Sequence, residues 1–215
     1  MLPNIENLRQ DYRLASLDIS DVAANPIEQF KKWFAEALEA QLPEPNAMTL
    51  ATATPDGKPT LRVVLLKSFD YNGFVFYTNY NSRKGKELAT NPHAALSFLW
   101  LELERQVRIE GTIEKVSAEE STVYFQSRPK GSQIGAWASP QSTVIPNRNV
   151  LEDTVAALNQ RYENEPVLPR PEYWGGYVVK PTLVEFWQGR SNRLHDRLQY
   201  TWQSDQTWKI ERLAP

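Results

Sequence analysis

A stretch near the end of the sequence, FWQGRSNRLHDR at residues 186–197, holds three arginines, an aspartate and one of the chain's two histidines. Arginine binds anions through charged N–H donors, and histidine can transfer a proton near neutral pH. The stretch is typical of a strand, a turn and a second strand over residues 193–202. Because alternate side chains of a strand share a face, Arg193, His195 and Arg197 are predicted to point the same way.

The remaining charges of this stretch fall outside that face. Asp196 shares the opposite face with the apolar residues Leu198, Tyr200 and Trp202, which indicates a structural partner rather than a catalytic acid. Arg190 lies in the predicted turn, where we expect it to be solvated. From this stretch alone two interpretations stay open: a ligand site, or the solvated outer face of an antiparallel sheet.

A second group of cations lies in NYNSRKGKEL, where Ser82 is typical of a helix N-cap. Arg83 and Lys84 then fall in the first helical turn, where cations oppose the helix dipole at a cost of about 0.3–1 kcal/mol each. A bound anion would reverse that cost, because free N–H groups and two cations form a phosphate receptor. The alternative is that both side chains simply extend into water.

Two further sets could bind anions, although each is also typical of ordinary surface positions. In LRVVLLK, Arg62 and Lys67 bracket an apolar run, so the charges are predicted at the two ends of a strand. Tyr124 and Arg128 are four residues apart on a predicted helix and share a face, and Ser132 follows in a glycine-containing loop. Arginine, serine and tyrosine together suit a phosphate monoester.

Composition excludes several other chemistries. The sequence has no cysteine, which rules out disulfides, thiolate metal sites and cysteine nucleophiles and fits a reducing cytoplasm. Two histidines about a hundred residues apart provide no metal-ligand spacing, so no metal is expected. A net charge of −2 gives no overall attraction to nucleic acid or to an anionic membrane. No apolar run approaches the roughly 20 residues that span a bilayer, and there is no GxGxxG, Walker A or GxSxG motif.

The elements that must position these residues are mostly strands in hairpin succession. This order predicts a mainly β protein, an antiparallel barrel with peripheral helices, rather than a doubly wound sheet. A weak helix is predicted over residues 4–14, and a clear one from Pro26 to before Pro43, capped by Asn25. Residues 129–147 are predicted as a polar loop. The remaining predicted helices cover 117–128 and 150–162, and the predicted strands cover 47–54, 59–67, 74–79, 93–101, 106–116, 176–179, 182–188, 193–202 and 207–213.

Several strings together resemble the pyridoxine/pyridoxamine 5′-phosphate oxidase family: EFWQGRSNRLHDR, RVVLLK, FYTNYNSRKGKEL, ERQVRIEG, SRPKGSQIGAWAS, PQS and the terminal WKIERLAP. The resemblance runs from LRQDY to Pro215. It implies an FMN-binding split β-barrel that works as a homodimer with FMN at the interface. It further implies oxidation of pyridoxine or pyridoxamine 5′-phosphate to pyridoxal 5′-phosphate by O2, with release of hydrogen peroxide and, from the amine, ammonia.

The family's site residues carry over by motif onto matching positions of this sequence. Implied FMN-binding residues are Arg62, Val63, Val64, Leu65, Leu66, Lys67, Tyr77, Thr78, Arg83, Lys84, Gln106, Gln141, Ser142, Trp187 and Arg197. Implied substrate-binding residues are Arg9, Tyr12, Lys67, Tyr124, Arg128, Ser132, Arg193, Leu194 and His195. Of these, Arg193 and His195 are implied to contact the substrate, and Arg197 to lie near the flavin, which makes the three the expected catalytic residues.

The resemblance also suggests how the chain is divided. Residues 1–24 are expected to form an N-terminal segment that closes over the site, and residues 25–215 a single barrel domain with C-terminal dimerisation hairpins. Residues 13–24 lack the glycines and the basic run of some family members, which leaves the behaviour of that segment open. Other functional classes also remain: a flavin reductase acting on NAD(P)H, a non-catalytic flavin or haem barrel, and a pyridoxal phosphate carrier.

Overall fold

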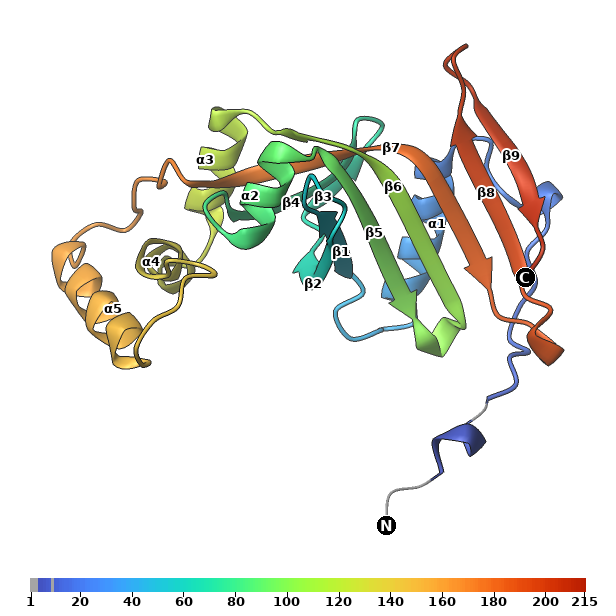
Figure 1. The fold of residues 1–215 in the computed structure, drawn as a ribbon, viewed down its shortest axis with the longest axis horizontal. Helices are drawn as coiled ribbons and strands as arrows, with labels where there is room; N and C mark the ends of the chain where they lie inside the picture. Colours follow the sequence, from blue (N-terminus) through green and yellow to red (C-terminus); the bar gives the residue numbers. More distant parts are fainter. Residues whose placement is uncertain (1–3, 9) are drawn as a thin grey trace. The chain divides into compact units, whose positions relative to one another are not determined.

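A computed structural model describes residues 4–8 and 10–215 of the chain, and strands dominate this part (Figure 1). The strands form one sheet in the order β2-β1-β5-β6-β7-β4-β3, and β8 pairs with β7 and β9. Their bounds are β1 Ala47–Ala53, β2 Pro59–Leu65, β3 Ser68–Asp70, β4 Gly73–Asn79, β5 His93–Trp100, β6 Arg105–Lys115, β7 Trp174–Gln188, β8 Asp196–Trp202 and β9 Trp208–Leu213. The helices are α1 Pro26–Glu39, α2 Arg83–Thr90, α3 Ala118–Ser127, α4 Lys130–Ala138 and α5 Asn149–Arg161.

The chain divides into two compact units. Unit 1 contains the chain up to Leu50, residues 95–111 and residues 181–215, and unit 2 contains residues 51–94 and 112–180. Strands β1, β5, β6 and β7 each contribute residues to both units. The division follows the chain only loosely, because each unit is assembled from segments far apart in the sequence.

Strand β7 is continuous where the sequence predicts two separate strands, 176–179 and 182–188. Its first part pairs antiparallel with β4, from Asn79↔Trp174 to Phe74↔Val179. Its second part pairs antiparallel with β8 over residues 183–188. Pro181, which lacks a backbone N–H, falls between these two registers, so its missing donor removes no hydrogen bond to β4 or β8.

Unit 1 is built around aromatic side chains of α1, β5 and β7. The Asn25 side chain caps α1 by accepting the Ile27 N–H at 2.8 Å, as predicted. Phe30 packs on Phe98 at 5.0 Å between ring centroids, and Trp33 meets Phe186 edge to face at 5.2 Å. Each such buried aromatic side chain contributes about 1.5–3 kcal/mol of transfer free energy.

Unit 2 contains a second apolar cluster that decides the structure of residues 129–147, which were wrongly predicted as a loop throughout. Residues 130–138 form α4, and Ile134 from this helix is buried with Phe125 and Trp174. The two glycines of α4 lower its intrinsic helix propensity, so the helix depends on this packing, which the local sequence does not reveal.

Three other predicted elements differ from the structure. Within the described part of residues 4–14, only a 3-10 turn at Ile5–Asn7 forms. The short strand β3 was not predicted. The strand predicted from Arg193 begins only at Asp196, because residues Ser191–Arg193 form a 3-10 turn in which Asn192 and Arg193 have positive φ angles of 57° and 62°. No helix of the described residues is long and apolar enough to cross a membrane.

Candidate functional site

The first cluster of candidate residues lies at the start of α2 in unit 2. Ser82 caps the helix, as predicted, and its Oγ accepts the Gly85 N–H at 3.3 Å. The Lys84 ammonium group donates to Gln141 Oε1 at 2.9 Å and lies 3.3 Å from Thr78 Oγ1. The structure therefore brings together three predicted FMN-binding residues that are up to 63 positions apart in the sequence.

The partners of Lys84 are all uncharged. Its ammonium group forms no ion pair within the described part of the chain. Burial lowers the pKa of Lys84, and the nearby charge of Arg62 lowers it further. A bound anion would oppose both effects, which is the behaviour expected of an anion receptor.

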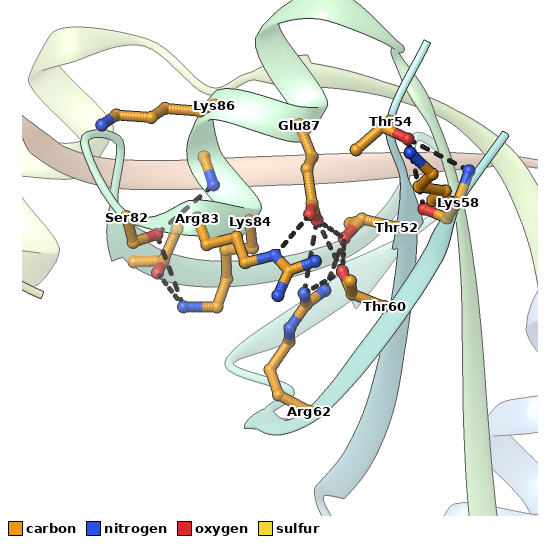
Figure 2. Close-up of polar contacts among 12 residues, drawn as sticks. Thr52, Thr54, Lys58, Thr60, Arg62, Ser82, Arg83, Lys84, Lys86 and Glu87 are labelled. Carbon is orange, nitrogen blue, oxygen red and sulfur yellow. Dashed lines mark hydrogen bonds and ion pairs between the residues drawn. The ribbon is translucent and has the colours of Figure 1, made fainter. Parts of the chain in front are cut away.

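Arg62 and Arg83 differ from Lys84, because both contact the carboxylate of Glu87 (Figure 2). Arg83 Nε lies 2.9 Å from Glu87 Oε1, and Arg62 NH2 lies 3.4 Å from Glu87 Oε2. The sequence left open whether Arg83 binds an anion or extends into water; in the structure its side chain is mostly exposed and pairs with Glu87. The sequence signal for this pair is the spacing of four residues between Arg83 and Glu87 on one helix, which places opposite charges side by side.

The second cluster, also in unit 2, contains Tyr124 and Arg128. The Tyr124 ring stacks on Tyr77 with 3.9 Å between centroids, and Trp174 continues the stack at 5.5 Å from Tyr77. The Arg128 guanidinium lies over the Trp174 ring, with Cζ 4.7 Å from its centroid. Burial lowers the pKa of Arg128, and its NH1 atom is buried with no hydrogen-bond partner among the described residues.

An unpartnered buried guanidinium nitrogen costs free energy unless a ligand satisfies it, so this atom points to an anion site. Ser132 lies in the first turn of α4, not in a loop as predicted, and its side chain is exposed. Lys67 follows the end of β2 and is exposed, and its ammonium group makes no hydrogen bond or ion pair within the described chain. Among the apolar residues of the same stretch, Leu66 is buried, Val64 and Leu65 are half-buried, and Val63 is exposed.

The third cluster lies in unit 1 and contains Arg193 and His195. Both line a cavity of about 760 Å³, together with Tyr12 and Arg190. The His195 ring lies 4.5 Å from Trp187 and 6.0 Å from Tyr12 between centroids. Although Arg193 is not in a strand, it reaches the same cavity as His195 through the 3-10 turn.

The environment of His195 favours its neutral form. Burial lowers the pKa of His195, and the charge of Arg193 lowers it further. Its Nδ1 accepts the backbone N–H of Arg190 at 3.1 Å. In the neutral ring the proton therefore sits on Nε2, which leaves Nε2–H as a donor.

Arg197, the third member of the predicted trio, also belongs to unit 1 and is held by an ion pair. Its guanidinium binds Glu185 through two contacts, Nε to Oε1 at 2.7 Å and NH2 to Oε2 at 3.1 Å. Glu185 is buried and also binds Arg108 NH1 at 3.2 Å. Arg197 is not among the residues that line the cavity, but it pairs across the strands with Trp187, whose ring contacts His195, so these two members of the trio lie on one side of β8 while Arg193 lies outside the strand.

Asp196 is a structural partner, as predicted. Its carboxylate accepts the Leu17 N–H at 3.0 Å and pairs with Arg190 and Arg212 at 2.8 Å each. Arg190 is therefore not merely solvated, which corrects the prediction, because it pairs with Asp196 and lines the cavity. The turn residue Leu194 is 69% exposed.

The N-terminal segment reaches the same cluster in part. The backbone oxygen of Tyr12 accepts the Ser191 hydroxyl at 3.3 Å, and the Tyr12 ring meets Trp187 edge to face at 5.9 Å. Gly189 is needed for this approach, because a Cβ there would lie 2.8 Å from Tyr12 Cβ. Arg9 lies outside the described residues. Gln106 is half-buried in β6, and Ser142 has a φ of 69°.

Comparisons with known proteins agree on one family. Residues 34–162 match the sequence profile of pyridoxamine 5′-phosphate oxidase, and residues 174–215 match the pyridoxine 5′-phosphate oxidase C-terminal dimerisation region. The pyridoxine/pyridoxamine 5′-phosphate oxidase of Trichormus variabilis is 60% identical over 211 residues, 98% of each chain. That of Salinibacter ruber is 59% identical over 216 residues and covers 100% of both chains.

Solved structures show the same architecture. PhzG from Burkholderia lata, in complex with tetrahydrophenazine-1-carboxylic acid, has a TM-score of 0.86 at 34% identity and covers 94% of this chain and 100% of its own. A pyridoxamine 5′-phosphate oxidase-related, FMN-binding protein from Nostoc punctiforme has a TM-score of 0.68 at 20% identity and covers 86% and 97%, which shows the fold alone. The described chain is therefore a mainly antiparallel β protein with the split-barrel fold, and by sequence and structure it belongs to the pyridoxamine 5′-phosphate oxidase family.

Proposed function

We propose that this chain uses FMN to oxidise pyridoxine 5′-phosphate or pyridoxamine 5′-phosphate to pyridoxal 5′-phosphate, with O2 as the electron acceptor. Identity of about 60% over the full length of oxidases of these two substrates supports the reaction. The observation that carries it in the structure is Arg128, whose buried NH1 atom has no partner in the described chain. A phosphorylated substrate supplies the missing acceptor.

The cluster at α2 fits the phosphate of FMN. Lys84 has only uncharged partners, Thr78 and Gln141 lie within hydrogen-bond distance of it, and the exposed Arg83 side chain lies in the same helical turn. A phosphate monoester would accept from these donors and from the helix N-terminus. When bound there, FMN would supply the two-electron acceptor for oxidation of the substrate and would pass the electrons to O2, which would be released as hydrogen peroxide.

The chain's own residues bind and orient the substrate. In unit 2, Arg128 binds the substrate phosphate, with Tyr124, Ser132 and Lys67 as further proposed contacts. In unit 1, Arg193 and the Nε2–H of His195 contact the pyridine substituents from the cavity that both residues line. Arg197, which Glu185 holds in place, is proposed as a contact of FMN, where its positive charge would favour electron uptake by the flavin.

The assembly proposed is a homodimer with FMN at the subunit interface. The match of residues 174–215 to a dimerisation region supports two copies of the chain. The proposed N-terminal lid over residues 1–24 draws support from the contacts of Tyr12 with Ser191 and Trp187.

One anaerobic experiment tests the proposed function. The purified chain should show a flavin spectrum, and addition of pyridoxamine 5′-phosphate without O2 should bleach the visible flavin band. Bleaching by NADPH but not by pyridoxamine 5′-phosphate would instead indicate a flavin reductase. An unchanged spectrum at saturating pyridoxamine 5′-phosphate would contradict the oxidase and leave a binding barrel or a carrier.

A further inference from the structure

Glu87 is a buried carboxylate in α2 that is not among the residues proposed to contact FMN or the substrate. It is 5% exposed, and it lies one helical turn after Arg83. Thr52 and Thr60 donate their hydroxyl protons to its Oε2 at 2.5 Å and 2.6 Å. All of these residues belong to unit 2, in strands β1 and β2 and helix α2.

The same two hydroxyl groups also connect Glu87 to Arg62. Arg62 NH1 donates to Thr52 Oγ1 and Arg62 NH2 donates to Thr60 Oγ1, both at 2.6 Å. Each hydroxyl therefore accepts from the guanidinium and donates to the carboxylate. The network is closed, so Arg62 is fixed to Glu87 both directly and through two threonines, as Figure 2 shows.

Arg83 is fixed through one nitrogen only. Its Nε binds Glu87 Oε1, while its two terminal nitrogens make no hydrogen bond within the described chain. The Arg83 side chain is 65% exposed, so these nitrogens are accessible. The two terminal nitrogens of an arginine form a fork that matches two phosphate oxygens.

The charge of Glu87 also separates two like charges. Burial acts to raise the pKa of Glu87, but the hydrogen bonds from Thr52, Thr60 and Arg83 and the charge of Arg62 outweigh it and lower the pKa to about 2. The carboxylate is therefore ionised throughout the working pH range. Without it, the guanidinium ions of Arg62 and Arg83 would repel each other and the exposed Arg83 would turn toward solvent.

We propose that Glu87 is a positioning residue that holds Arg62 and Arg83 side by side so that they receive the phosphate group of FMN. The inference rests on the proposed function, because it takes the group bound at α2 to be the phosphate of this cofactor. Glu87 itself does not touch the phosphate, since two anions would repel. It acts through the two arginines that it orients.

Charge and position have opposite effects here, which makes the proposal testable. Loss of a negative charge near a phosphate site would by itself strengthen binding of a phosphate. If the two arginines were no longer held side by side, binding of the phosphate would weaken. Weaker phosphate binding after removal of the Glu87 charge can therefore come only from lost positioning.

The experiment titrates FMN and riboflavin, which lacks the phosphate, into the full-length chain freed of flavin, with flavin fluorescence as the readout. In Glu87→Gln, we expect FMN to bind about tenfold more weakly, the lower end of the effect of partners that orient contacting groups in metal sites. Riboflavin binding should stay unchanged. Glu152→Gln is the matched control, because Glu152 pairs with Arg148 at the same spacing of four on the exposed face of α5.

A second variant keeps the proposal testable if Glu87→Gln does not fold. Glu87→Asp keeps the charge but shortens the side chain, so the ratio of FMN to riboflavin affinity should fall while electrostatic attraction stays constant. A wild-type ratio in folded Glu87→Gln or Glu87→Asp, as judged by circular dichroism, would overturn the proposal. If the wild-type chain binds FMN no better than riboflavin, the proposed function fails instead.

Discussion

The cations of the candidate site fall into two groups that the structure treats differently. Arg62 and Arg83 share the buried carboxylate of Glu87, and Arg197 is held by the buried carboxylate of Glu185. Lys84, Arg128 and Arg193 form no ion pair within the described residues. The first group is oriented before any ligand arrives. The second group lacks a counter-charge until a ligand provides one.

Counter-charges determine where ligand binding can release free energy. Burial lowers the pKa of both Lys84 and Arg128, so each charge is held at a cost in the ligand-free chain. A phosphate removes that cost, whereas at a paired arginine the carboxylate has already removed part of it. Unpaired cations should therefore govern ligand affinity and turnover, and paired cations should govern stability and geometry.

Replacement of Arg193 should have the largest effect. Arg193→Met removes an unpaired charge that lines the cavity beside His195, and we expect turnover to fall by about 10²–10³-fold, the usual cost of losing one donor to the reacting groups. Bound FMN, measured from the flavin spectrum, should be retained. If loss of FMN accounts for the whole defect, the role of Arg193 is wrong.

The pairing of Arg62 and Arg83 with Glu87 should make the stability of the fold depend on pH in the acid range. The pKa of Glu87 is about 2 in the folded chain against 4.5 in the unfolded chain, so the unfolded chain binds the proton first as the pH falls. The stability from this group is fully present above about pH 4.5 and is lost as the pH falls toward 2, by up to about 3 kcal/mol. Urea unfolding at about pH 6 and at about pH 3 measures this difference in the free energy of unfolding.

Glu87→Gln serves as the comparison in that experiment, because it removes this one titration and leaves the other carboxylates in place. The loss of unfolding free energy between the two pH values should be smaller in the variant. An equal loss in both proteins would show that Glu87 is not protected in the folded chain.

Arg128 provides the sharpest contrast with a neighbouring arginine, Arg170, whose guanidinium has neutral hydrogen-bond acceptors within the chain. Arg128→Met should raise the KM for pyridoxamine 5′-phosphate by about 10–100-fold, the equivalent of one charged hydrogen bond, without lowering the melting temperature. Arg170 is the control, since it donates to the Trp174 carbonyl and to Thr122. Arg170→Met should lower stability and leave KM nearly unchanged. The reverse pattern would break the comparison.

Asp196 tests a paired position next to the cavity. Asp196→Asn removes the charge that pairs with Arg190 and Arg212, and it weakens the hydrogen bond from the Leu17 N–H. The free energy of unfolding should therefore fall by about 1–2 kcal/mol. Glu211→Gln, in the exposed pair with Lys209, should change it by less than about 1 kcal/mol. A large loss of turnover at unchanged stability would make Asp196 a catalytic acid after all.

The smallest expected effect is a shift in the pKa of His195. Burial is the first cause that lowers this pKa and the charge of Arg193 is the second, so Arg193→Met should raise it toward the ordinary value. Imidazole NMR signals followed against pH measure the shift. The chain has one other histidine, so His93→Gln assigns the signals. An unchanged pKa would mean that Arg193 and His195 do not interact.

Local sequence signals predicted most elements, and they failed where packing decides. Asn25 and Ser82 were identified as helix caps because side-chain capping depends on neighbouring residues. Helix α4 was missed because it depends on the burial of Ile134 against Phe125 and Trp174. The strand predicted at Arg193 was wrong because its positive φ breaks the alternation of a strand, although Arg193 still lines the cavity with His195.

The sequence by itself determined the family, the mainly antiparallel fold and the residue types of the site, because these depend on motifs and local periodicity. Apart from Arg83, whose spacing of four from Glu87 indicates a pair, it could not decide which cations have counter-charges. That depends on contacts between residues far apart in the chain, such as Thr52 and Arg62 with Glu87, or Lys84 with Gln141. Those groups come within hydrogen-bond distance only in the folded chain. The tertiary structure therefore distinguishes the arginines that carboxylates orient from the cations that have no counter-charge in the chain.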